Sequence, residues 1–165
     1  NCNHNQLTTL EGCPKEVGDS FYCNDNLLTT LEGSPKKVGE HFICNKNKLT
    51  TLKGCTEEVG GGFSCLLNEL ISLEGGPKKV GSFFDCSSNK LTSLEGYPKE
   101  LDGYFECWRN PIENIYNLFG SLKEFQDSMD YGYLRGTDII KLRFKEALEE
   151  IGVKLPKEIK GYNYI

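Results

Sequence analysis

Six cysteines recur at a constant interval of 21 residues, and this interval constrains the fold more than any other feature of the sequence. No residue is inserted or deleted between successive copies. The ladder consists of Cys2, Cys23, Cys44, Cys65, Cys86 and Cys107. A fixed period of roughly 20–50 residues is typical of a solenoid, because each unit is too small to bury its own apolar face and stacking the units creates one continuous core.

Other residues keep the same step. A phenylalanine precedes each of the later five ladder cysteines by two residues, and an asparagine follows every ladder cysteine by three. Since Phe-x-Cys alternates with a period of two, both side chains point inward from a short strand, and one such strand per coil gives a parallel sheet. Glycine and, in most copies, proline also recur, leaving no room for a long helix, so the opposite, convex side of each coil is expected to be irregular or extended.

The repeat resembles that of the leucine-rich repeat family. Gly18–Leu28 follows the core pattern L-x-x-L-x-L-x-x-N-x-L, with Phe21 and Cys23 at two of the leucine positions and Asn26 at the asparagine. Its first leucine position holds glycine, with Val17 one residue early, which departs from the pattern. The downstream Leu-Thr-Thr-Leu-Glu-Gly-x-Pro resembles the short bacterial class of these repeats, known from secreted effectors, and the whole is similar to uncharacterised bacteriophage proteins.

The resemblance covers about residues 1–115 and implies a leucine-rich repeat solenoid over 1–110. In such folds, the strand residues between the inward ones face the concave side, which is where protein partners usually bind. Effector ligases with similar repeats carry a catalytic cysteine in a separate downstream domain. The last cysteine here is Cys107, inside the repeats, so that activity is not carried over to this chain.

Periodicity fades after Asn110, and residues 111–165 are predicted to form a C-terminal α-helical cap, because a solenoid must cover its last coil. Residues 112–119 have apolar positions at helical spacing, and 122–129 is predicted as a second short helix. Residues 131–136 are predicted as a turn. A separate activity in this tail is the alternative to a cap.

The clearest helix is predicted over 138–151, with Thr137 or Asp138 as its N-cap and Gly152 at its end. Its apolar stripe consists of Ile140, Phe144, Ala147, Leu148 and Ile151. Residues 153–165 are predicted to be extended.

At the other end, the chain begins inside a predicted strand, so we expect upstream residues to be missing, processed or disordered. If they are absent, the exposed N-terminal edge would pair with another chain and give a homo-oligomer.

Composition narrows the class of partner. Charged residues make up 26% and aromatic residues 11% of the 165 residues, and the net charge is −5. This balance argues against global disorder and against nucleic-acid binding, which usually brings a basic patch. No apolar run approaches the roughly 20 residues that a membrane span needs. We therefore expect a partner that is neither nucleic acid nor a membrane.

The asparagine and cysteine ladders are predicted to be structural. An inward asparagine amide can satisfy backbone groups where the chain leaves each strand. A cysteine at a core leucine position behaves as a small buried hydrophobe, whereas zinc sites need clustered ligands that this sequence lacks. The structural residues are Asn26, Asn47, Asn68, Asn89, Cys23, Cys44, Cys65 and Cys86.

Disulfides within the ladder and a metal site are the weaker alternatives. A disulfide is possible because neighbouring strands lie about 4.8 Å apart, so that adjacent thiols could meet. Cys13 and Cys55 lie off the ladder, two coils apart and too far to bridge. Eight free thiols favour a reducing compartment, so we expect a cytoplasmic protein (in the host cytoplasm if it comes from a phage), with no metal and no cofactor.

Two pairs of residues imitate catalytic arrangements. Ser20 and His41 are one period apart and would be strand neighbours, but no third residue orients the imidazole. Asp85 and Glu106, also one period apart, would lie near the carboxylate separation of about 5 Å that retaining glycosidases use. A sheet face without a deep cleft gives neither acid a reason for a raised pKa, so we expect ordinary surface residues or a cation contact.

The outward strand positions change character along the chain. The N-terminal coils repeat a polar asparagine row just after the ladder cysteine, at Asn3, Asn24 and Asn45, and the later coils replace it with apolar or aromatic residues. Because a contiguous exposed apolar patch marks an interface, and Trp, Tyr and Arg are the usual energetic anchors, we predict a partner-binding surface there. Its residues are Leu66, Leu67, Phe83, Tyr104, Trp108 and Arg109. Covering of Tyr104 and Trp108 by the cap is the alternative explanation.

These observations together predict a non-catalytic module that binds another protein through the concave strand face. The alternatives are a self-assembling structural protein that uses the solenoid edge, and an inhibitor or enzyme activity in the tail. A self-assembling protein should change size with concentration, and a tail activity should survive removal of the repeats.

Overall fold

The computed structural model describes the chain except for residues 120–123, 125–126, 129–133, 136–137, 140 and 161. The chain divides into two compact units, Asn1–Arg109 and Asn110–Ile165.

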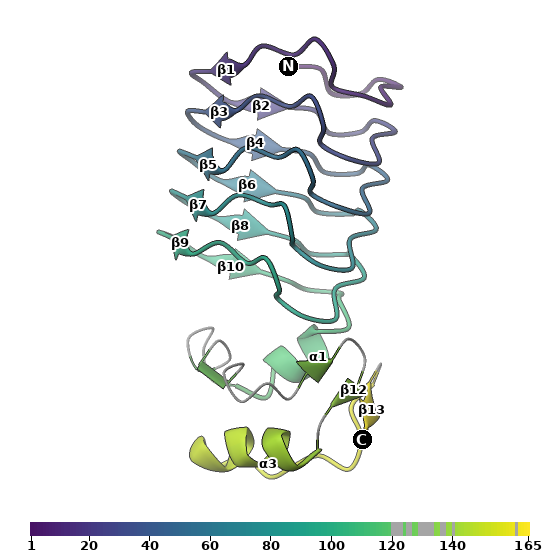
Figure 1. Ribbon diagram of the computed structural model, residues 1–165, viewed down its shortest axis with the longest axis vertical. Helices are drawn as coiled ribbons and strands as arrows, with labels where there is room; N and C mark the ends of the chain where they lie inside the picture. Colours follow the sequence, from purple (N-terminus) through teal and green to yellow (C-terminus); the bar gives the residue numbers. More distant parts are fainter. Residues whose placement is uncertain (120–123, 125–126, 129–133, 136–137, 140, 161) are drawn as a thin grey trace. The chain divides into compact units, whose positions relative to one another are not determined.

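The first unit is a parallel β-solenoid in which each coil contributes two short strands (Figure 1). The first sheet has the order β1-β3-β5-β7-β9, and the second sheet has the order β10-β8-β6-β4-β2. The strands of the first sheet are β1 (Glu16–Val17), β3 (Lys37–Val38), β5 (Glu58–Val59), β7 (Lys79–Val80) and β9 (Glu100–Leu101). Those of the second sheet are β2 (Phe21–Tyr22), β4 (Phe42–Ile43), β6 (Phe63–Ser64), β8 (Phe84–Asp85) and β10 (Phe105–Glu106).

The prediction of one strand per coil was therefore wrong, since the side expected to be irregular or extended forms a sheet of its own. The reason is a second alternation in the repeat. Each strand of the first sheet pairs an exposed charged residue with an aliphatic one, and Val38, Val59 and Val80 are buried. Two residues suffice for this strand, because the coil before and the coil after supply its hydrogen-bonding partners.

The register places identical side chains above one another. Phe42 pairs with Phe63, and Phe63 with Phe84, each a full 21 residues further along the chain. The ring centroids of these pairs lie 5.6 and 5.2 Å apart, which is the distance at which aromatic rings pack favourably. Leucine and cysteine ladders beside them complete a core that runs through all the coils.

Glycine allows the coils to approach closely. A Cβ atom added to Gly60 would lie 2.0 Å from the carbonyl oxygen of Gly39 in the preceding coil. One added to Gly54, which has a φ of +90°, would lie 2.5 Å from the backbone of Glu32. No larger residue fits at either position without separating the coils.

The second unit contains the helices α1 (Glu113–Tyr116) and α3 (Lys141–Glu150) and a three-stranded sheet. In this sheet, β12 (Asp138–Ile139) is antiparallel to β11 (Leu134–Arg135) and parallel to β13 (Asn163–Tyr164). No helix among the described residues is long and apolar enough to cross a bilayer.

Helix α3 begins later than predicted, because Asp138 and Ile139 belong to β12 and not to the helix. Its end agrees with the sequence, since Gly152 has a φ of +72° and the amide of Val153 donates to the carbonyl of Leu148. In its apolar stripe, Phe144, Ala147 and Leu148 are buried, while Ile151 is half-buried.

Of the helix predicted over 112–119, only the four residues of α1 are helical. The helix predicted over 122–129 and the turn over 131–136 fall mostly outside the described residues, as do Thr137 and Ile140. The stretch 153–165, predicted to be extended, contains β13.

Candidate functional site

The asparagine ladder fixes where each coil leaves the second sheet. Asn47 is buried, and its amide nitrogen donates to the carbonyl oxygens of Cys23, Cys44 and Asn45 at 3.1–3.2 Å. Its amide oxygen accepts a hydrogen bond from the backbone of Leu28 at 3.0 Å. Asn26, Asn68 and Asn89 repeat this pattern. Each amide thus joins two coils through the inward position that the repeat predicted.

The cysteine ladder is packed and protonated. All eight thiols are free, and Cys23, Cys44, Cys65 and Cys86 are buried. Burial raises the pKa of each of these four thiols well above its ordinary value, and the negative charge of Asp85 raises the pKa of Cys65 and Cys86 further. The thiolate is the form that attacks electrophiles or binds metals, so these four thiols are unreactive in the folded chain. In the described part of the chain, no three His, Cys, Asp or Glu side chains are grouped as metal ligands.

The outer face of the second sheet is formed by three columns of side chains, each with one residue per coil. The first column is Ser20, His41, Gly62, Phe83 and Tyr104. The second column is Tyr22, Ile43, Ser64, Asp85 and Glu106. The third column is Asn24, Asn45, Leu66, Ser87 and Trp108. The 21-residue register of β2, β4, β6, β8 and β10 keeps the members of each column side by side.

The first column contains an aromatic stack. The Phe83 ring lies 5.6 Å from the imidazole of His41, with 29° between the planes, and 5.6 Å from the ring of Tyr104, with 17°. Phe83 and His41 are two coils apart, and the residue between them is Gly62. A Cβ atom at Gly62 would lie 2.1 Å from the Phe83 ring, so the ring covers the space that this glycine leaves open.

Ser20 and His41 are neighbours, as predicted, but they do not form a nucleophile–base pair. The Ser20 hydroxyl donates to the Glu40 carboxylate at 3.3 Å and accepts from the backbone amide of His41. The imidazole Nδ1 of His41 accepts a hydrogen bond from the amide of Gly62 at 2.8 Å. This ring nitrogen is therefore engaged with the backbone and is not directed at the serine.

Asp85 and Glu106 are direct neighbours in the register of β8 and β10, and both are half-buried. The carboxylate of Asp85 accepts from the amide of Ser87 at 2.9 Å and from the hydroxyl of Ser64 at 3.3 Å. These bonds hold one acid in a defined orientation beside a second one, in the middle column of the outer face.

None of the predicted partner-binding residues is buried. Leu67, Tyr104 and Trp108 are 43%, 59% and 51% exposed, Arg109 is also exposed, and Leu66 and Phe83 are half-buried. Phe83 and Tyr104 flank the acidic pair from the first column and Trp108 flanks it from the third, while Leu66 lies in the preceding coil.

Leu67 and Arg109 belong to a further column, which follows the third one and has a left-handed backbone. Sequence reasoning missed this conformation. The φ angles of this column lie between 51° and 57°, at His4, Asp25, Lys46, Leu67, Ser88 and Arg109. Asp and His tolerate this region better than most residues, so His4 and Asp25, each one position before the asparagine, were the available signal. Leu67, which is exposed, gains little stability from this left-handed backbone conformation.

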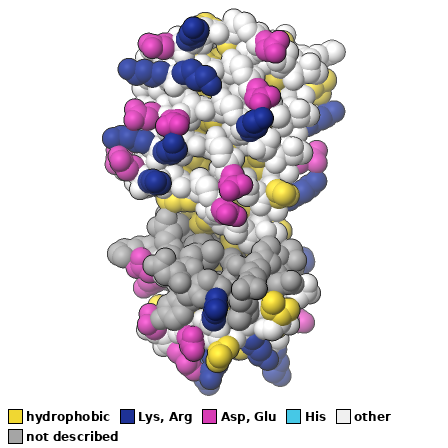
Figure 2. Space-filling model, in the orientation of Figure 1, with side chains coloured by type: hydrophobic (Ala, Val, Ile, Leu, Met, Phe, Trp, Pro, Cys, Tyr) yellow, Lys and Arg dark blue, Asp and Glu magenta, His cyan; other side chains and the backbone are white. Residues whose placement is uncertain are grey.

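The outer face of the first sheet is different in character. Its register sets Glu16 beside Lys37 and Lys79 beside Glu100, and the latter pair forms an ion pair at 2.9 Å. Figure 2 shows charged side chains of both signs interspersed over the repeats. Such a surface is an ordinary solvated face, and it offers control positions for mutagenesis.

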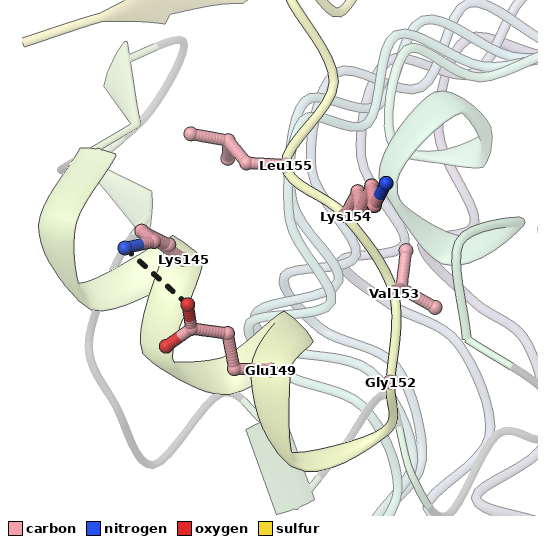
Figure 3. A pocket seen from close by; sticks show the side chains of 6 residues that line it. All are labelled: Lys145, Glu149, Gly152, Val153, Lys154 and Leu155. Carbon is pink, nitrogen blue, oxygen red and sulfur yellow. Dashed lines mark ion pairs between the residues drawn. The ribbon is translucent and has the colours of Figure 1, made fainter.

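The second unit has a shallow cavity of about 280 Å³ beside the end of α3 (Figure 3). Gly152, Val153, Lys154 and Leu155 line it opposite the helix. The helix contributes Lys145 and Glu149, which form an ion pair at 3.3 Å. This lining combines aliphatic groups with one ion pair and the additional charge of Lys154.

No protein-family model, curated protein or solved structure matches the chain. The geometry of its own side chains is therefore the basis for a functional proposal.

Proposed function

We propose that the chain is a leucine-rich repeat protein whose function is non-catalytic binding of another protein. The partner docks on the outer face of the second sheet, in the coils that contain β6, β8 and β10. Two features support membership of that family: the inward leucine and phenylalanine ladders, and an asparagine that bonds to backbone groups of two successive coils.

One observation carries the binding proposal. Tyr104, Trp108 and Leu67 are large apolar side chains that remain exposed on one side of the solenoid, with Leu67 in the coil of β6 and the other two in the coil of β10. The equivalent outward positions of the N-terminal coils are polar, such as Ser20, Asn24 and Asp25. Stacking of the coils does not require apolar residues there, since the first coils stack without them, and Trp and Tyr are the side chains that most often anchor protein interfaces.

Eight free thiols fit a reducing compartment, which supports a cytoplasmic location, in the host cytoplasm if the protein is of phage origin. The ion-paired cavity beside α3 gives less support to a tail activity than the exposed aromatic residues give to binding.

The proposal is tested by affinity capture from a lysate of the source cells with three forms of the chain. These are the wild type, the double variant Phe83→Asp, Tyr104→Asp, and a control double variant Lys37→Asp, Glu58→Lys on the first sheet. We expect the control to retain the captured protein and the Phe83, Tyr104 variant to stay folded and lose it. Retention by the latter variant would move the site to another face or to the tail, and concentration-dependent size of the pure chain would favour self-assembly.

A further inference from the structure

Ser87 carries the one buried side-chain oxygen or nitrogen in the described residues that has no hydrogen-bond partner. The residue follows β8 by two positions and is only 6% exposed, whereas its equivalents Asn24, Asn45 and Leu66 in the preceding coils are half-buried. A buried hydroxyl without a partner is unfavourable, and such groups are rare in folded proteins. A ligand that supplies the missing hydrogen bond would be favoured at this position.

The neighbours of Ser87 in the third column are Leu66 in the preceding coil and Trp108 in the following one. Backbone hydrogen bonds hold the three coils together here, from the amide of Leu67 to the carbonyl of Ser87 at 3.0 Å, and from the amide of Ser88 to the carbonyl of Trp108 at 2.7 Å. A short polar side chain thus lies between two long apolar ones.

The adjacent middle column contributes negative charge. Asp85 precedes Ser87 by two residues and accepts its amide hydrogen at 2.9 Å, and Glu106 is the register neighbour of Asp85. A carboxylate has about four lone-pair sites, so Asp85 keeps acceptor capacity beyond its two hydrogen bonds to Ser87 and Ser64.

We propose that an arginine side chain of the protein partner binds at Ser87, between Leu66 and Trp108, with its guanidinium group bonded to the Ser87 hydroxyl and the Asp85 carboxylate. The inference rests on the proposed function, because it names the chemistry that the partner presents to the same face.

Arginine fits this combination better than other side chains. Its aliphatic stem matches Leu66, its planar cation stacks on an indole ring, and its five N–H donors reach a hydroxyl and a carboxylate at the same time. Lysine offers a point charge without the planar fork. Arg109 is exposed next to Trp108, and its positive charge repels a cation. The two negative charges of Asp85 and Glu106 exceed this single positive charge.

Binding at Ser87 also predicts a movement. The Ser87 hydroxyl has less than 1 Å² of accessible surface, so a ligand reaches it only after a flanking side chain rotates. Trp108 is the only tryptophan of the chain and is 51% exposed, so its fluorescence reports such a rotation directly.

The experiment titrates the full chain with the peptide acetyl-Gly-Arg-Gly-amide and follows Trp108 emission. We expect a saturable change with a Kd on the order of millimolar, as for one weakly anchored side chain. The same peptide with citrulline, which keeps the shape of arginine without its charge, should give no saturable change. A citrulline response equal to that of arginine, or no saturable response to arginine, overturns the proposal.

Three variants locate the site. Asp85→Asn should weaken binding about tenfold through loss of a charge-assisted hydrogen bond, and Glu58→Gln on the first sheet should leave it unchanged. Ser87→Ala should weaken binding about threefold without lowering the melting temperature, since it removes a hydroxyl that has no partner in the free protein. Unchanged binding by both the Asp85 and the Ser87 variants places the arginine elsewhere and contradicts the proposal.

The outcomes separate this inference from the proposed function. If the arginine peptide fails to bind while partner capture still depends on Phe83 and Tyr104, the arginine site is wrong and the docking face stands. If the peptide binds at Ser87 while capture ignores Phe83 and Tyr104, the docking face is wrong.

Discussion

At Asn47, one side chain makes four hydrogen bonds to the backbone of two coils. Replacing it by alanine leaves buried carbonyl and amide groups without a partner, so Asn47→Ala should lower the free energy of unfolding by about 1–3 kcal/mol. Thermal or urea unfolding measures this loss. Asn24→Ala is the control, because Asn24 lies in an outer column and its amide donates to the side chain of Asp25. Equal melting curves for the two variants would show that the inward assignment of Asn47 is wrong.

The buried thiols make stability depend on pH. Burial raises the pKa of Cys23, Cys44, Cys65 and Cys86 in the folded chain, whereas the unfolded value is about 8.5. A raised folded pKa gives stability that is fully present below the unfolded pKa and is lost as the pH rises above it. We expect the free energy of unfolding to fall by about 1.4 kcal/mol per buried thiol for each pH unit above 8.5. Urea unfolding at pH 7.5 and 9.5 tests this, and a flat profile would contradict it.

The same four thiols should resist a thiol reagent while the protein is folded, and all eight should react after denaturation. A count below eight in protein that was never reduced would indicate a disulfide or a bound metal.

At the scale of the element, the spacing of the coils depends on glycine. Gly18→Ala and Gly60→Ala are a matched pair at equivalent positions two coils apart. A Cβ atom at Gly18 meets nothing within 4 Å, while one at Gly60 lies 2.0 Å from the oxygen of Gly39. Gly60→Ala should therefore destabilise the protein by at least about 2 kcal/mol more than Gly18→Ala. Urea unfolding of both variants measures the difference, and equal free energies of unfolding would mean that these coils do not approach as described.

The elements also show which parts of the fold the sequence predicts. The period, the inward phenylalanines and the coil boundaries follow from exact repetition, because each copy is a control for the others. The first sheet was missed, since its two-residue strands have no alternation long enough to detect within one coil. The start of α3 was missed because β12 pairs with Asn163 and Tyr164, which are distant in the sequence and carry no periodic signal.

The candidate site also has a part that the sequence predicts and a part that it does not. Its members were predicted because they break the polar pattern of the earlier coils. The stacking of Phe83 on His41 was not predicted, because it depends on the space that Gly62 leaves open in the coil between them. The missing hydrogen bond of Ser87 was also beyond the sequence, since burial of an outward serine depends on its neighbours in other coils.

At the scale of the whole molecule, a regular stack presents two different faces. On the outer face of the first sheet, positive and negative residues alternate from coil to coil, as at Glu58 and Lys79. This face is suited to contact with solvent. On the outer face of the second sheet, the first and third columns change from polar residues in the first coils to aromatic residues in the last one, while the middle column changes from Tyr22 and Ile43 to Asp85 and Glu106. Since the phenylalanine, cysteine and leucine ladders of the core are the same throughout, stacking of the coils does not require this change.

Hydroxyl-radical footprinting of the chain, alone and with its captured partner, tests the binding face most directly. Large exposed apolar side chains report from both units, with Leu67, Tyr104 and Trp108 in the first and Leu142 and Ile165 in the second. We predict that the partner lowers oxidation of Leu67, Tyr104 and Trp108 and leaves Leu142 and Ile165 unchanged. Protection of Leu142 and Ile165, with Tyr104 and Trp108 oxidised as in the free protein, would contradict binding through the second sheet.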